Sequence, residues 1–327
     1  MNALYDAIVL AGDRRDSHSV FGENKAFLEI AGCPLLGHVL RALDRSPSVG
    51  RAILVGDPKR LAEAVRRAGP DLRVRVELVA QGEGLWENFW AGYLATLSPT
   101  ARARIASGER PEDAVTPEER DRYVLALSGD IPLIHPGEIE GFLAGATALG
   151  ADYVAGCTPE ASLEPFYPGP DAPGIKMAYF QLREGRFRQN NLHLVRPLRV
   201  ACRDRIERLY RHRYQRRIRN AVRMAMEIRR TRAVGLSIVW GYVLLHVALK
   251  LDLRGWRRTS DFIRRFLPMA RVEWAVSRML GGSFRMACLP APGAALDIDQ
   301  EADYDALKTR FDEWRQRVAE GASAAPS

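Results

Sequence analysis

Positively charged side chains follow the first apolar run of the sequence. Tyr5–Leu10 has the composition of a buried parallel strand and leads into Ala11-Gly12-Asp13-Arg14-Arg15, with Lys25 fourteen residues after Ala11. Glycine lets a backbone approach a ligand closely, and anions bind at N–H groups of strand-to-helix turns. Arg14, Arg15 and Lys25 add cations there. The stretch predicts a polyphosphate site, although an ordinary turn with solvated arginines remains the alternative.

Carboxylates form a second group of candidate residues. Asp130 follows the apolar run Tyr123–Leu127, and Asp297 and Asp299 stand close together near the end of the chain. Ligands of open α/β sheets gather at the carboxyl ends of the strands, where Asp130 is expected. The helix predicted to begin near Pro136 starts too late for Asp130 to be its cap. Asp130 is therefore a candidate metal ligand.

The elements that must position these residues alternate between strand and helix. Strands are expected at 5–10, 52–57, 74–79, 123–127 and 152–157, and helices at 35–43, at 60–68 and after Gln81. This alternation indicates βαβ units, and hence an α/β fold with a mostly parallel central sheet flanked by helices. A hairpin is expected between 175–182 and 192–195. A strand at 283–289, a helix at 303–318 and a frayed tail complete the chain.

Two segments interrupt this pattern. Residues 99–122 are polar and contain Gly108, Pro111 and Pro117, which favours a mobile insertion over a lid. Residues 199–282 are helical in pattern. Their first part, 199–232, holds thirteen arginines against three acidic residues, whereas the whole chain carries a net charge of +8. The apolar stretch 233–249 is shorter than a usual membrane span and predicts a buried or interfacial helix.

Four motifs in sequence order resemble the MobA-like NTP transferases, which are nucleotidyltransferases with a Rossmann-related fold. The chain has Leu10-Ala11-Gly12 followed by a basic loop, Lys25 and the segment Gly32-Cys33-Pro34-Leu35-Leu36. Asp13 stands where the family usually has a second glycine. The other motifs are Ser128-Gly129-Asp130-Ile131-Pro132-Leu133, Asn190–Pro197 and Asp297-Ile298-Asp299 with Asp303. The resemblance covers roughly residues 1–198 and 283–315.

The resemblance implies a reaction and a set of roles. An NMP group would pass from an NTP to a phosphorylated acceptor, with Mg²⁺ as cofactor and pyrophosphate as product. It implies catalytic roles for Arg14, Lys25 and Asp130, and nucleotide contacts from residues 10–13, Arg15, Gln81 and Asn88. The metal ligands would be Asp130, Asp297 and Asp299. The acceptor would be contacted by Lys176, Asn190 and Asn191. Trp86 and Trp90 are expected to pack in the core, with base stacking as the alternative.

This pattern predicts a nucleotidyltransferase domain, 1–198 with 283–327, and an arginine-rich helical insertion, 199–282. An NDP-sugar glycosyltransferase of related fold and a non-catalytic nucleotide- or membrane-associated protein remain as alternatives. The acceptor is expected to be a small molecule or a lipid precursor. An anionic membrane surface is a candidate partner through 199–251. Nucleic acid is disfavoured because the arginines lack the aromatic pattern of a recognised RNA-binding module.

The composition sets the expected compartment. The chain begins in a strand without a basic and apolar leader, and Cys33, Cys157, Cys202 and Cys288 show no zinc or disulfide spacing. We therefore expect a cytoplasmic protein, with peripheral attachment at the inner face of the membrane as a further expectation.

Overall fold

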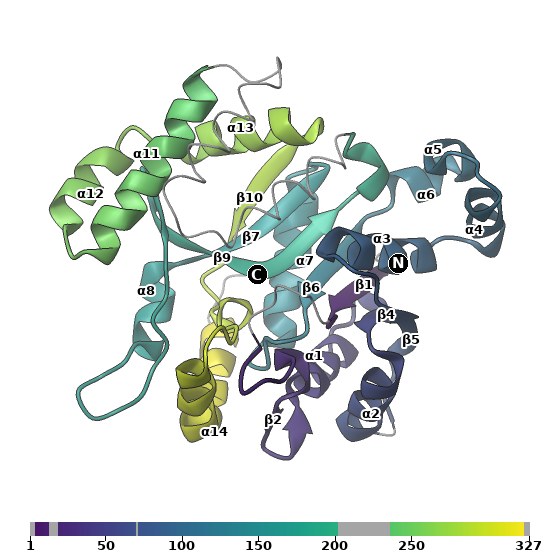
Figure 1. Cartoon of the computed structure of the whole chain (residues 1–327), viewed down its shortest axis with the longest axis horizontal. Coiled ribbons are helices and arrows are strands. Elements are labelled where there is room, and N and C mark those ends of the chain that lie inside the picture. Colours follow the sequence, from purple (N-terminus) through teal and green to yellow (C-terminus); the bar gives the residue numbers. More distant parts are fainter. Residues whose placement is uncertain (1–3, 13–18, 70, 202–235, 324–327) are drawn as a thin grey trace.

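A computed structural model describes residues 4–12, 19–69, 71–201 and 236–323. Figure 1 shows a central twisted sheet with helices on both faces. The strands of this sheet are β1 (Tyr5–Leu10), β4 (Val49–Gly56), β5 (Arg75–Ala80), β6 (Val124–Ser128), β7 (Tyr153–Pro159), β8 (Phe180–Leu182), β9 (Gly185–Val195) and β10 (Phe284–Cys288). β2 (Glu29–Ile30) and β3 (Cys33–Pro34) form a separate small ribbon. The α/β fold with a mostly parallel sheet is confirmed.

The helices of the described residues fall into groups by position. Those around the sheet are α1 (Leu35–Asp44), α2 (Pro58–Ala68), α3 (Leu85–Thr96), α4 (Pro99–Ala106), α5 (Pro111–Ala114), α6 (Pro117–Asp121), α7 (Pro136–Ala148), α8 (Glu160–Leu163) and α14 (Glu301–Ser323). The helical wing, as we call it, consists of α11 (Leu236–Leu253), α12 (Arg257–Arg264) and α13 (Met269–Leu280). Short 3₁₀ turns are η1 (Lys25–Phe27), η2 (Glu164–Phe166), η3 (Pro197–Arg199) and η4 (Gly293–Ala295).

The strand order is β10-β7-β9-β6-β1-β4-β5, with β8 paired to β9. β1 runs parallel to β4 and β6, β4 parallel to β5, and β10 parallel to β7. β9 is antiparallel to β6 and β7, between which it lies. The long strand β9 therefore joins two parallel groups into one sheet, and its polar residues extend past the carboxyl end of β6.

The apolar runs form central strands because both faces of the sheet are covered. Ala7 and Val9 face the core shared with α1, α2 and α7, whereas Ile8 between them faces the core shared with α3 and α4. α3 packs especially close, since a Cβ at Gly92 would lie 2.6 Å from Cγ2 of Ile8. A third core beneath α14 encloses Trp314.

The segment 99–122 is folded, which corrects the expectation of a mobile insertion. It forms α4, α5 and α6, each with proline at its first turn. Ser98 caps α4, and Thr116 with Glu119 forms a capping box at α6. Ala101, Ala114 and Val115 are buried. The polar composition misled the prediction because these helices are too short to show an amphipathic period.

Two other boundaries differ from the expectation. The hairpin is present, but β8 spans only 180–182 and pairs with 185–187, while 192–195 pair with β6 and β7. The final helix continues to Ser323 instead of ending near 318. The predicted arginine-rich helix at 199–232 lies almost wholly outside the described residues, and the division into two domains stays a prediction.

Within the wing, α11 and α12 pack against β8, whereas α13 lies along β10 (Figure 1). Arg186 of β9 holds α11 and α12 there, with its guanidinium 3.5 Å from a carboxylate oxygen of Asp252 and 3.0 Å from one of Asp261. Ser260 also donates to the carbonyl of Ala248, joining α12 to α11. Within the described residues, no helix combines the length and apolarity that a bilayer crossing requires.

Candidate active site

The register of two parallel strands brings the first predicted motif beside the second. Leu10 of β1 is paired with Ser128 of β6, and the amide of Gly129 donates to the carbonyl of Leu10 at 3.0 Å. The residues that follow, Ala11-Gly12 and Gly129-Asp130, therefore leave the sheet side by side at its carboxyl edge. This is the edge at which open α/β sheets bind ligands.

Asp130 occupies a half-buried position at this edge. The hydroxyl of Ser128 donates to its carboxylate. Burial and the nearby charge of Asp297 raise the pKa of Asp130 to about 6, against the opposing effects of Lys25 and Ser128. The N-cap of α7 is His135, as expected if Asp130 has another role. The two carboxylates, Asp130 and Asp297, thus lie near enough to interact electrostatically.

Asp297 is held by an arginine from β9. Nη2 of Arg188 lies 2.8 Å from Oδ1 of Asp297, and both side chains are largely buried. Burial would raise the pKa of Asp297, but Arg188 and Lys25 hold it below its ordinary value. Nε of Arg188 is buried and has no hydrogen-bond partner among the residues that the structure describes. Arg188 therefore keeps Asp297 ionised and retains a donor.

Lys25 connects the basic loop to the closing motif. Its Nζ lies 2.8 Å from Oδ1 of Asp299. Burial would lower the pKa of Lys25, but Asp130, Asp299 and Asp297 together raise it above its ordinary value. Lys25 begins the turn η1, which Asn24 caps while its amide also donates to the carbonyl of Ala11 at 2.9 Å. Asn24 thereby ties Lys25 to the end of β1.

The metal assignment rests on the same carboxylates. Across the described ranges, no three acidic, histidine or cysteine side chains are gathered as in a preformed metal centre. Asp299 pairs with Lys25 and is 59 % exposed, whereas Asp297 pairs with Arg188. Ligation by Asp130, Asp297 and Asp299 stays a prediction.

Gly12 lies against the two polar residues predicted to meet the nucleotide. A Cβ at Gly12 would lie 2.5 Å from Nδ2 of Asn88 and 3.1 Å from Oε1 of Gln81, so only glycine fits without displacing them. Asn88 is buried, and its Oδ1 accepts from the amide of Gly82 at 2.6 Å. The structure thus brings Gly12, Gln81 and Asn88 together, and their contacts to nucleotide stay predictions.

Trp86 and Trp90 pack against the core on the α3 side of the sheet. Their rings stack on each other at 5.8 Å, and both are half-buried beside Phe89 and Tyr93. This arrangement agrees with the core role that their spacing predicts.

The three predicted acceptor residues have different surroundings. Lys176 is exposed, and no hydrogen bond or ion pair joins it to the carboxylates within the described part of the chain. Asn190 is buried and uses its amide inside the protein, accepting from the amide of Leu192 and donating to Thr158. Asn191 donates to the carbonyl of Ala294, which connects β9 to the segment before Asp297.

Asp13, Arg14 and Arg15 lie outside the described residues. Leu10 ends β1 and Ala11 follows it; their carbonyls accept from Gly129 and Asn24, respectively. The roles assigned to residues 10–15 from the sequence remain predictions.

Sequence analysis gave no role to Asp303 of the closing motif, and it overlooked Glu138 and the partner of Arg188. Asp303 accepts from the amides of Asp299 and Gln300 and so caps α14 directly after the acidic pair. Glu138, 1 % exposed, accepts from the amide of Ala294 beneath η4. Asp303 has a recognisable cap spacing, whereas Glu138 and the pairing of Arg188 with Asp297 depend on contacts distant in sequence.

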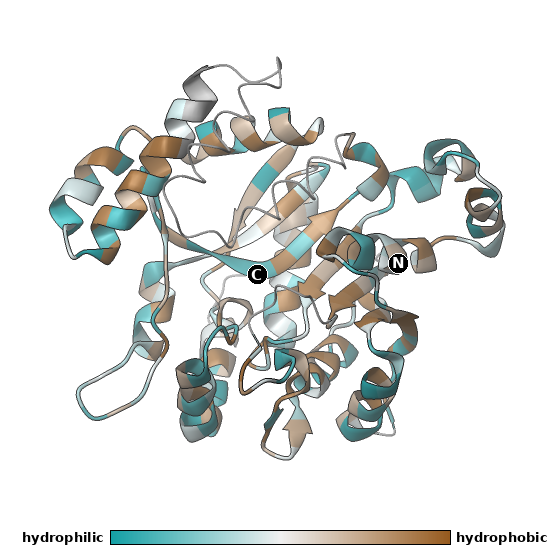
Figure 2. Cartoon of the chain, in the orientation of Figure 1, coloured by the Kyte–Doolittle hydropathy of each residue, from teal (hydrophilic) through white to brown (hydrophobic). Residues whose placement is uncertain are grey.

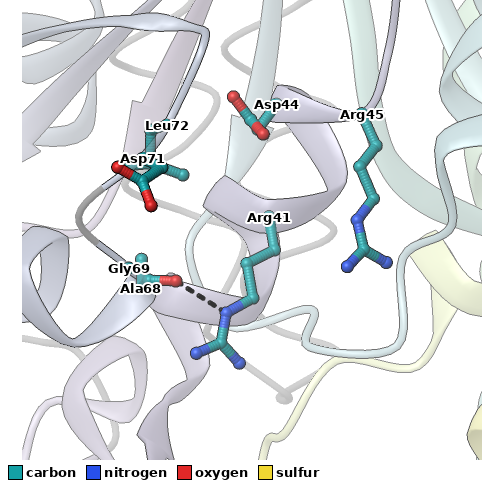
Figure 3. Close-up of a pocket in the computed structure, with 7 residues that line it drawn as sticks. All are labelled: Arg41, Asp44, Arg45, Ala68, Gly69, Asp71 and Leu72. Atoms are coloured by element: carbon teal, nitrogen blue, oxygen red, sulfur yellow. Dashed lines mark hydrogen bonds between the residues drawn. The ribbon is translucent and has the colours of Figure 1, made fainter.

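A surface pocket lies away from this site, between the ends of α1 and α2 (Figure 3). Arg41 and Asp44, two of its polar residues, form hydrogen bonds with neighbouring backbone groups. Nε of Arg41 donates to the carbonyl of Ala68 at 2.8 Å, and Asp44 accepts from the amides of Arg73 and Val74. The helix ends that line it lead into the amino ends of β4 and β5, so it opens at the sheet edge opposite Asp130.

Known proteins match the chain in sequence and in fold. The model of the MobA-like NTP transferase domain matches residues 7–227. The 2-C-methyl-D-erythritol 4-phosphate cytidylyltransferase of Pelotomaculum thermopropionicum is 29 % identical over 154 residues, which are 46 % of this chain and 55 % of that protein. The chain thus spans about half the length of this curated relative.

A solved structure supports the fold over nearly the whole chain. A hypothetical transferase from Thermus thermophilus aligns with a TM-score of 0.61 and 24 % identity, covering 92 % of this chain and 99 % of its own. The family match covers about two thirds of the sequence and includes most of β1, Lys25 and Asp130. The chain therefore belongs to the MobA-like NTP transferase domain family, a family of nucleotidyltransferases.

Proposed function

We propose that the protein transfers an NMP group from an NTP to a phosphorylated acceptor and releases pyrophosphate. The observation that carries this proposal is the meeting of Lys25, Asp130, Asp297 and Arg188 at the carboxyl edge beside Gly12. Family membership supports the reaction class. CTP is the first nucleotide to test, because the name of the curated relative is that of a cytidylyltransferase.

The reaction needs positioning and charge neutralisation more than a covalent nucleophile. The acceptor phosphate attacks the α-phosphorus in line with the bond to pyrophosphate. Lys25 is a cation at the end of the basic loop, and it can exchange Asp299, which is mostly exposed, for a phosphate oxygen. There it stabilises the charge that develops on the leaving pyrophosphate.

The carboxylates fit a Mg²⁺ ion bound together with nucleotide. Mg²⁺ takes one or two carboxylates and completes its shell with waters and phosphate oxygens, so a preformed cage of three ligands is not needed. Asp130 and Asp297 lie close enough for the charge of one to raise the pKa of the other, which a cation relieves. Bound there, Mg²⁺ would neutralise charge on the phosphates. Arg188 orients Asp297, and Ser128 orients Asp130.

A pyrophosphate-release screen tests this function. CTP, ATP, GTP and UTP are each combined with sugar-, polyol- and alcohol-phosphates in the presence of Mg²⁺. We expect release that requires one NTP and one acceptor together and stops when EDTA is added. Release from an NTP without acceptor, or turnover of an NDP-sugar in its place, would contradict the proposal.

The exposed apolar side chains of the wing suggest a surface at which the protein binds a partner that carries the acceptor. Of the exposed large apolar side chains among the described residues, seven belong to the wing and its turns, and four to the rest: Trp240, Val247, Leu253, Trp256, Phe262, Phe266 and Trp274 against Leu4, Phe21, Leu78 and Leu149. Figure 2 shows the apolar stretches of α11 and α12. Exposed apolar side chains gathered in one region mark an interaction surface.

The charge of the wing favours an anionic membrane as its partner. Residues 236–282 carry eight basic and three acidic side chains, directly after the thirteen arginines of 199–232. Tryptophan is enriched at membrane–water interfaces, and each nearby basic residue contributes about 1 kcal/mol at an anionic surface. We therefore propose peripheral attachment at the cytoplasmic face of a membrane, where the wing presents the active site to a lipid-linked or lipid-precursor acceptor.

Vesicle binding separates this surface from an oligomer interface. The full chain is sedimented with phosphatidylcholine vesicles that either contain or lack phosphatidylglycerol. We expect binding only to anionic vesicles and its loss at high salt. The triple variant Trp256→Ala/Phe262→Ala/Phe266→Ala should bind at least roughly tenfold more weakly. The matched control Leu78→Ala/Leu149→Ala removes exposed apolar groups outside the wing and should bind normally. Self-association without vesicle binding would overturn the proposal.

A further inference from the structure

Two cysteines that are far apart in the sequence meet on neighbouring strands. Cys157 of β7 and Cys288 of β10 are direct partners in the parallel register. Their Sγ atoms lie 3.0 Å apart, with both thiols free. Strands in a sheet are about 4.8 Å apart, which falls within the range of Cα separations that disulfides span. Closing the sulfurs to the bond length of about 2.05 Å needs a movement of only about 1 Å.

The two thiols differ in access and in acidity. Cys157 is fully buried beside Leu182, Phe187 and Leu267, whereas Cys288 is exposed. The hydrogen bond between the sulfurs lowers the pKa of Cys288 and, together with burial, raises that of Cys157. Cys288 is therefore the more acidic of the two thiols and the one that an oxidant in solution can reach, and Cys157 is a thiol that can resolve the product.

We propose that Cys157 and Cys288 form a reversible dithiol–disulfide site, a property separate from the proposed transfer reaction. A peroxide oxidises the Cys288 thiolate to sulfenic acid and is itself reduced to hydroxide. The sulfur of Cys157 then attacks that of Cys288, the S–S bond forms, and the sulfenic oxygen leaves as water. Overall, two thiols and one hydrogen peroxide give one disulfide and two waters.

The bond would fasten an edge strand next to the active site. Cys288 ends β10, and the chain continues through η4 to Asp297. Cys157 is followed by Thr158, which is paired with Arg188 of β9, the residue that binds Asp297. The amide of Leu289 already donates to the carbonyl of Cys157 at 2.8 Å, so the bond would add to an existing backbone contact. The covalent loop from 157 to 288 would enclose the whole wing.

Thiol titration and peptide mapping of the full chain test the site. After treatment with hydrogen peroxide, we expect the free thiols to fall from four to two, with one cross-linked peptide pair that contains Cys157 and Cys288. Dithiothreitol should restore all four thiols. Loss of no thiols, or a cross-link to Cys33 or Cys202 instead, would overturn the proposal.

Single variants assign the order of steps. In Cys157→Ser, Cys288 should accumulate as a sulfenic acid that dimedone labels, and in Cys288→Ser the three remaining thiols should persist through the same treatment. Cys33→Ser, which removes a buried thiol elsewhere, should leave the cross-link unchanged. Dimedone labelling of Cys157 in Cys288→Ser would contradict the assignment of Cys288 as the reacting thiol. If a variant fails to fold, the peptide map of the unaltered chain still decides the main question.

Discussion

Nζ of Lys25 lies 2.8 Å from Oδ1 of Asp299, although 274 positions separate them in the chain. This contact joins the basic loop after β1 to the acidic motif before α14. The fold thus closes its site with the last part of the chain. A cation and a mostly exposed carboxylate form a pair that an incoming phosphate can open, since exposed ion pairs are weak.

Replacing Lys25 with alanine should weaken NTP binding. A charge-assisted contact to phosphate contributes ~1.5–3 kcal/mol, which corresponds to roughly tenfold to hundredfold in Kd. Calorimetric titration with the preferred NTP measures this change. Lys59→Ala removes an exposed lysine from α2 and serves as the matched control. Equal affinities for the two variants would place Lys25 outside the nucleotide site.

Gly12→Ala should damage the site through crowding. The new methyl group would meet Nδ2 of Asn88 at 2.5 Å and displace a side chain that is tied to Gly82. Overpacking of this kind costs about 1–3 kcal/mol, so we expect a lower melting temperature together with weaker nucleotide binding.

Gly84→Ala is the matched control for Gly12→Ala, because no atom lies within 4 Å of a Cβ at Gly84. Thermal unfolding and calorimetry on both variants complete the comparison. A Gly12→Ala protein that binds nucleotide as tightly as the Gly84→Ala protein would show that Gly12 does not approach the ligand.

The sequence predicts the sheet better than it predicts the site. Ala7, Ile8 and Val9 belong to cores on opposite faces, so a continuous apolar run is enough to identify a central parallel strand. The sequence does not show that β9 lies antiparallel between β6 and β7, because the local pattern of residues does not specify which strands pair. The pairing of Arg188 with Asp297 depends on that arrangement and could not be read from the sequence.

The helices α4 and α6 begin at cap patterns that are visible in the sequence. These patterns are Ser98-Pro99 and Thr116-Pro117 with Glu119. In the structure, the Ser98 side chain accepts from the amide of Ala101, and Thr116 and Glu119 form a capping box. Cap residues thus identify short helices in which the hydrophobic period is too brief to be seen.

Glu138 should make stability depend on pH. Burial raises its pKa to about 7 from 4.5, although the amides of Ala294, His135 and Gly293 oppose this. A raised pKa means that the folded state binds the proton more tightly. The stabilisation is therefore complete below about pH 4.5 and is lost as the pH rises through about 7. Over this range the free energy of unfolding should fall by roughly 3 kcal/mol.

Urea unfolding of wild type and Glu138→Gln at intervals from pH 4.5 to 8 measures this dependence. The glutamine retains an acceptor for the amide of Ala294 and should remove most of the decline. The control is Glu140→Gln, two residues further along α7, in which stability should decline with pH as in wild type. The account of Glu138 would be wrong if the free energy of unfolding fell equally with pH in Glu138→Gln and in wild type.

Arg186→Gln should loosen the wing. It removes one of two cations that Glu160 and Asp252 share, because Arg257 also pairs with both carboxylates. The cost should therefore stay below the roughly 3–5 kcal/mol of a buried charge that loses its only partner. Amide exchange of α11 and α12 should accelerate, while that of β1 and β4 stays slow. Arg183→Gln, which removes an exposed arginine 3.5 Å from Glu184, is the control. Unchanged exchange in α11 and α12 would show that Arg186 does not hold the wing.

The most direct test of the central claim is pyrophosphate release by Asp130→Asn, measured with the NTP and acceptor that the screen identifies and Mg²⁺ in excess. Asp71→Asn, at the surface pocket on the opposite edge, is the matched control. Both proteins should show the far-ultraviolet spectrum and melting transition of the wild type. The account predicts loss of release by at least roughly a hundredfold in Asp130→Asn and full activity in Asp71→Asn. Release at the wild-type rate by folded Asp130→Asn would contradict it.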